Sequence, residues 1–78
     1  MDMQSIFGYI ESMYISTKKC LEMGLIGPEQ VKQVQLQCFA VVDYYDYMTF
    51  DRDIEVTAKK WEKWSAKFDD LTACKPVK

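Results

Sequence analysis

The chain has 78 residues, of which 49% are hydrophobic and 28% are charged. This balance is too hydrophobic for intrinsic disorder and too highly charged for a membrane protein, and the length leaves room for one small core. The net charge of −2 gives no general attraction to nucleic acid or anionic lipid, and the absence of histidine excludes histidine-dependent catalysis and zinc sites that contain histidine.

Residues 3–23 predict an amphipathic helix, because apolar side chains recur every three or four positions. This stripe consists of Met3, Ile6, Phe7, Ile10, Met13, Tyr14, Thr17, Cys20 and Leu21. Gly24 then suits the left-handed position that follows a helix end, and Pro28, preceded by Gly27, suits the first position of a new helix. A capped turn between two helices is therefore expected here.

Residues 28–48 predict a second helix with apolar side chains on two faces. One stripe consists of Val31, Val34, Cys38, Val41, Val42 and Tyr45, and the other contains Leu36, Phe39 and Tyr47. A helix that is apolar on two faces is typical of a central position or an interface. Leu36 and Phe39 are therefore our candidate contacts for a homodimer.

Residues 52–73 predict a third helix, because Ile54, Trp61 and Phe68 recur every seven residues. One unbroken helix over residues 28–73 would be ~69 Å long at 1.5 Å per residue, so we place a turn near residues 48–53. Thr49, Asp51 and Asp53 are its candidate N-caps. We expect an all-α fold, a small antiparallel three-helix bundle with helices at about 3–23, 28–48 and 52–73. Residues 1–75 would form its single domain and residues 76–78 a short tail.

The cysteines predict no metal site, because Cys20, Cys38 and Cys74 lack CxxC spacing and are too few for four thiolates. Reduced thiols, no basic leader and no apolar run of ~18 residues predict a cytoplasmic protein that does not enter a membrane. The sequence contains no phosphate-binding glycine loop and no evident acid/base pair. We therefore expect no enzymatic activity and no cofactor.

Residues 43–53 combine four aspartates and three tyrosines with a methionine and a phenylalanine. Tyrosine and methionine are enriched in interface cores, and a bundle of three helices cannot bury this many large side chains. The expected partner-binding residues are Asp43, Tyr44, Asp46, Tyr47, Phe50 and Asp51. The alternative interpretation is an aspartate-capped turn whose tyrosines pack by their rings and keep their hydroxyls in water.

A second aromatic segment is Lys59-Lys60-Trp61-Glu62-Lys63-Trp64, followed by Lys67 and Phe68. Interleaved lysines and aromatic residues are found in proteins that bind single-stranded nucleic acid or lie on membranes. Helical spacing, however, places the three large aromatic rings on one face and the lysines on the others. We therefore expect a buried aromatic seam with a solvated basic back.

These patterns favour a non-enzymatic protein–protein interaction module. A small acidic inhibitor or regulator, of the kind that phages or mobile elements encode, would fit the size and charge, and its partner would be a host protein with a basic surface. The alternative is a helix-turn-helix DNA-binding transcriptional regulator that uses residues 28–40, where glutamines such as Gln30 and Gln33 would read adenine edges. Few positive charges surround that segment, so the sequence favours a protein over nucleic acid as the partner.

Overall fold

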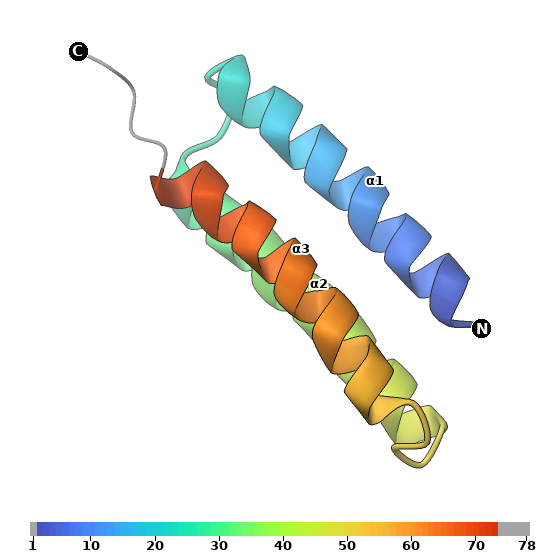
Figure 1. The fold of residues 1–78 in the computed structure, drawn as a ribbon. Helices are drawn as coiled ribbons and strands as arrows, with labels where there is room; N and C mark the ends of the chain where they lie inside the picture. The colour runs from blue at the N-terminus through green and yellow to red at the C-terminus, as the bar shows by residue number, and fades with distance from the viewer. Residues whose placement is uncertain (1, 74–78) are drawn as a thin grey trace.

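The computed structural model describes residues 2–73, which form three helices (Figure 1). Helix α1 spans Met3–Glu22, α2 spans Pro28–Met48 and α3 spans Ile54–Ala73. Figure 1 shows α2 running antiparallel to both neighbours, so that α1 and α3 point the same way. The predicted all-α antiparallel bundle is confirmed, with helix ends within two residues of the expected ones. Cys74 and the predicted tail of residues 76–78 lie outside the described residues.

Side chains close to each helix start determine where α1 and α2 begin. The Asp2 carboxylate accepts a hydrogen bond of 2.7 Å from the Ser5 backbone N–H, and this bond lowers the pKa of Asp2. At the start of α2, the Gln30 side-chain carbonyl accepts a bond of 2.9 Å from the Gly27 N–H. Pro28 occupies the first helical position, where its missing N–H costs nothing.

The end of α1 has the glycine cap that the sequence predicts. Gly24 has a φ of +76°, which is the left-handed region. Its N–H donates to the Leu21 carbonyl at 3.1 Å, and the Leu25 N–H donates to the Cys20 carbonyl at 2.9 Å. This pair of bonds is the Schellman motif, which satisfies carbonyls that the helix itself leaves without partners.

The core lies along the axis of the bundle and takes side chains from all three helices. Its buried members are Ile6, Ile10, Thr17, Val31, Cys38, Val42, Tyr45, Thr57 and Phe68. Burial raises the pKa of the Cys38 thiol to about 11, so this cysteine is a neutral core residue at physiological pH.

The predicted aromatic seam is present, but only Phe68 in it is fully buried. Tyr14 meets the rings of Phe68 and Trp64 edge-on, with centroid distances of 5.3 and 5.5 Å. Trp61 and Trp64 pack against the core and remain half-buried. Each tryptophan therefore borders a groove at the surface. None of the helices described for residues 2–73 combines the length and apolar character needed to cross a membrane.

Candidate functional site

Three aromatic side chains near the end of α2 are exposed, as the sequence predicts. The exposed fraction is 55% for Tyr44, 74% for Tyr47 and 92% for Phe50. We call these three residues the aromatic surface. Asp43 and Asp51, two further residues of the predicted set, are also exposed. The packing of the bundle therefore leaves these five side chains accessible to another molecule.

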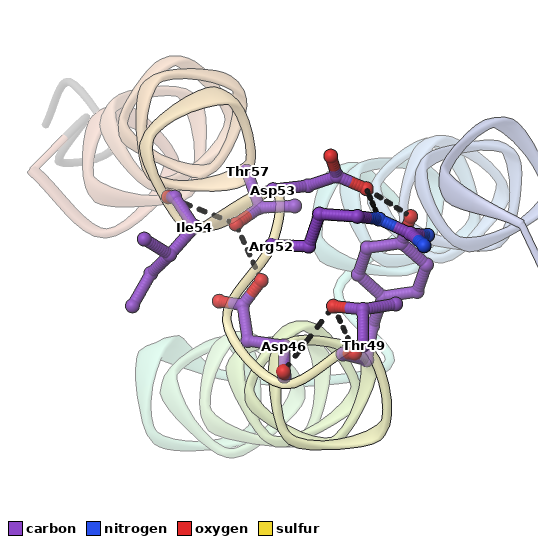
Figure 2. A network of polar contacts seen from close by, with 7 residues as sticks. Asp46, Thr49, Arg52, Asp53, Ile54 and Thr57 are labelled. Atoms are coloured by element: carbon purple, nitrogen blue, oxygen red, sulfur yellow. Dashed lines mark hydrogen bonds and ion pairs between the residues drawn. The ribbon is translucent and has the colours of Figure 1, made fainter.

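Asp46, the remaining member of that set, has a bond inside the fold. Its carboxylate accepts a hydrogen bond of 2.7 Å from the Thr57 hydroxyl, which is fully buried on α3 (Figure 2). Asp46 is half-buried as a result. It therefore joins the end of α2 to the start of α3.

A second bond joins the same two helix ends. The Tyr45 hydroxyl donates to the Asp53 carboxylate at 2.9 Å, while the Arg52 Nε lies 3.8 Å from the same carboxylate (Figure 2). The bond to Asp53 is the main reason that the pKa of Tyr45 is raised, because it stabilises the protonated phenol. Asp53 directly precedes α3, where its carboxylate could cap the helix. The carboxylate instead accepts the bond from the Tyr45 hydroxyl and so stabilises the turn.

The turn between α2 and α3 has an unusual backbone for its sequence. Phe50 and Asp51 have φ values of +53° and +59°, both left-handed. The Phe50 N–H donates to the Tyr47 carbonyl at 3.2 Å, and the Asp51 N–H donates to the Asp46 carbonyl at 2.8 Å. The turn is thus a second Schellman motif, with phenylalanine where Gly24 stands in the first.

This conformation is costly for Phe50. The left-handed region brings Cβ close to the following carbonyl oxygen, at a cost of roughly 1–2 kcal/mol for a residue other than glycine. A ring with 92% of its surface exposed gains almost no burial in return. The fold itself therefore gives no reason for a phenylalanine at this position. Backbone strain of this kind is concentrated at functional sites.

The two candidate dimer residues lie on the side of α2 that faces away from the core. Leu36 is 67% exposed and Phe39 is 47% exposed. The spacing of Leu36, Tyr44 and Tyr47 continues this outer stripe along the helix. Phe39 also touches α3, since its ring centroid lies 5.8 Å from that of Trp61.

A groove of about 350 Å³ lies where this outer face of α2 meets α3. We call it the α2–α3 groove; its lining residues are Phe39, Val42, Asp43, Asp46, Ile54, Ala58, Trp61 and Glu62. Its base is apolar and all its charged groups are carboxylates. The contribution of α3 was not among the predicted site residues, although Ile54, Ala58 and Trp61 have the spacing of one helix face.

The segment proposed for DNA recognition has a different geometry from a helix-turn-helix. In that motif the two helices cross at roughly 90–120°, whereas α1 and α2 lie antiparallel and side by side (Figure 1). Two of its glutamines have bonds within the fold. Gln30 caps α2, and the Gln35 amide donates to Ser65 Oγ and Asp69 Oδ1, each at 3.0 Å.

Residues 2–73 bring together no group of three or more histidine, cysteine or acidic side chains that could hold a metal ion. The chain matches no protein-family model, no curated protein and no solved structure. The site is therefore described by its own chemistry: exposed rings on α2 and in the turn that follows it, and an apolar groove between α2 and α3 whose charged residues are acidic.

Proposed function

We propose that this protein is a non-enzymatic protein–protein interaction module. The aromatic surface and the α2–α3 groove bind a partner protein that presents a basic surface. The observation that carries the proposal is Phe50, whose ring is 92% exposed while its backbone is held in the left-handed region. An exposed, strained phenylalanine is better explained by a contact outside the molecule than by the fold.

The energetics suit a small binding anchor. Fully burying a phenylalanine side chain contributes about 1.5–3 kcal/mol, which is comparable to or larger than its backbone strain. The bonds from Tyr45 to Asp53 and from Thr57 to Asp46 hold the turn in place before binding. Less conformational entropy is therefore lost when a partner covers the ring.

Charge supports a basic partner. Asp43 and Glu62 line the groove, and Asp51 follows Phe50 in the turn. Carboxylates at the rim of an apolar contact favour lysine and arginine on the opposite side and accelerate association with them. A small acidic inhibitor or regulator, of the type that phages or mobile elements encode, would act in this way. We place its action in the cytoplasm, because Cys20 and Cys38 are free thiols.

The experiment is affinity capture from the native host with three immobilised baits: the wild type, Tyr44→Ala/Tyr47→Ala, and the control Ile15→Ala, whose exposed apolar side chain lies on α1. The wild type and the control should retain the same basic protein, and the double variant should lose it while keeping its helicity. Equal retention on all three baits would contradict the proposal.

The DNA-binding alternative has no structural observation in its favour. The antiparallel packing of α1 and α2 and the bonds of Gln30 and Gln35 all oppose it. We expect only weak, sequence-independent binding to duplex DNA in a salt titration. Sequence-specific binding at nanomolar concentrations would revive this alternative.

A further inference from the structure

The bundle has a second charged groove, between α1 and α3, and its charge is opposite to that of the first. We call it the α1–α3 groove. It has a volume of about 180 Å³ and is lined by Phe7, Lys60, Lys63, Trp64 and Lys67. Its base is aromatic and its charged groups are all lysines. An adjoining groove of about 630 Å³ shares Phe7, Lys60 and Trp64 with it, and one carboxylate residue, Glu11, lines that neighbouring groove.

Two of the three lysines, Lys60 and Lys67, lie over aromatic rings. The Lys67 ammonium lies 4.4 Å from the ring centroid of Trp64, and the Lys60 ammonium lies 6.0 Å from that of Phe7. Within residues 2–73, Arg52 forms an ion pair with Asp53, but Lys60, Lys63 and Lys67 form no ion pair with a carboxylate. The groove is therefore a local positive region on an acidic protein.

The chain thus carries two complementary surfaces, and α3 contributes to both. Asp43, Asp46 and Glu62 give the α2–α3 groove its negative charge, and Lys60, Lys63 and Lys67 give the α1–α3 groove its positive charge. Each groove has a half-buried tryptophan at its apolar base, Trp61 in one and Trp64 in the other. Opposite charges around apolar contacts are the pattern of matched interfaces.

We propose that the α1–α3 groove of one molecule docks onto the α2–α3 groove of a second copy. This inference rests on the proposed function, because it names a partner for part of the same surface. The contact is heterologous, because it uses a different groove on each partner. A chain of docked copies therefore has an unoccupied α1–α3 groove at one end and an unoccupied α2–α3 groove at the other. Self-association therefore continues into chains or closes into a ring.

Other occupants fit less well. A stacked nucleic-acid base needs an open ring face, but Lys67 lies over the Trp64 ring and Tyr14 meets it edge-on. A two-fold dimer through the α2–α3 groove would bring the carboxylates of two copies together, which opposes association. Head-to-tail docking instead brings the acidic groove of one copy against the lysine-lined groove of the next.

The test is sedimentation velocity of the full chain from about 10 µM to 1 mM, at low and at high salt. Four proteins are compared: the wild type, Lys60→Glu/Lys63→Glu, Asp43→Lys/Glu62→Lys, and Lys19→Glu/Lys32→Glu. The last is the control, because it changes net charge as the first lysine variant does but lies outside both grooves. Lys67 is left unchanged because it packs over Trp64. Far-ultraviolet circular dichroism of each variant confirms that it is folded.

The wild type and the control should self-associate, and high salt should weaken this about tenfold by screening the charges. Each groove variant should be monomeric alone, and an equimolar mixture of the two should associate again, because the charges are then exchanged between molecules. A monomeric wild type at every concentration would overturn the inference. So would self-association that survives Lys60→Glu/Lys63→Glu. Neither outcome affects the proposed function, since these two lysines lie outside the aromatic surface.

Discussion

Replacing Phe50 with glycine is expected to make the protein more stable. Glycine adopts the left-handed backbone without the steric cost of roughly 1–2 kcal/mol that Phe50 bears. Its greater freedom in the unfolded chain offsets about 0.4–1 kcal/mol of that gain. Little burial is lost, because the ring is 92% exposed. The free energy of unfolding should therefore rise by about 0.5–1 kcal/mol, which for a domain of this size raises Tm by about 2–8 °C.

The assay is thermal and urea unfolding followed by circular dichroism, with Phe50→Ala as the matched variant. Alanine also removes the ring but keeps Cβ, so it retains the backbone strain and should stay within about 0.5 kcal/mol of the wild type. If the free energy of unfolding of Phe50→Gly is no higher than that of Phe50→Ala, the argument that the left-handed turn is strained is refuted.

Three further changes test the core and the braced turn. Phe68→Ala should lower the free energy of unfolding in urea by about 3–5 kcal/mol, because its ring is fully buried. Leu36→Ala should lower it by less than about 0.5 kcal/mol, because Leu36 is exposed. Equal losses would contradict the assigned core. Thr57→Val should cost about 1–3 kcal/mol, because it leaves the half-buried Asp46 carboxylate without its donor. Thr72→Val is the control, because it removes a threonine hydroxyl bond that is exposed to solvent. The raised pKa of Tyr45 means that its contribution to stability is complete below the ordinary tyrosine pKa of about 10 and is lost as pH rises through the higher folded value. Tyr45→Phe should therefore lose less stability than the wild type between pH 8 and pH 11 in urea titrations, and an equal loss would argue against the bond to Asp53.

The parts of the fold that depend on local sequence were predictable. Spacing of apolar residues located all three helices, and Gly24 located the first turn because glycine is the residue that adopts its backbone at least cost. The second turn was placed by a length argument and by the candidate N-caps Thr49, Asp51 and Asp53. This turn has the same pattern of hydrogen bonds as the first, but a phenylalanine at position 50 does not signal a left-handed backbone. The start of α3 was therefore predicted near residue 52, whereas the helix begins at Ile54.

The parts of the candidate surface that depend on contacts between helices were not predictable. The sequence counted Asp46 among the exposed acids, whereas its partner Thr57 is brought to it by the turn. Trp61 and Glu62 belong to the α2–α3 groove because their side of α3 packs next to α2, and the sequence does not specify which side does so. The same packing sets Lys67 over the Trp64 ring, although helical spacing alone placed lysines and tryptophans on separate faces.

The most direct test of the account is calorimetric titration of the captured partner with the wild type, Phe50→Gly and Phe50→Ala. If the ring of Phe50 is a binding anchor, both variants should bind at least about tenfold more weakly, a loss of about 1.4 kcal/mol, even though Phe50→Gly is the more stable protein. Wild-type affinity in either variant would show that the exposed phenylalanine does not bind the partner, and would contradict the central claim.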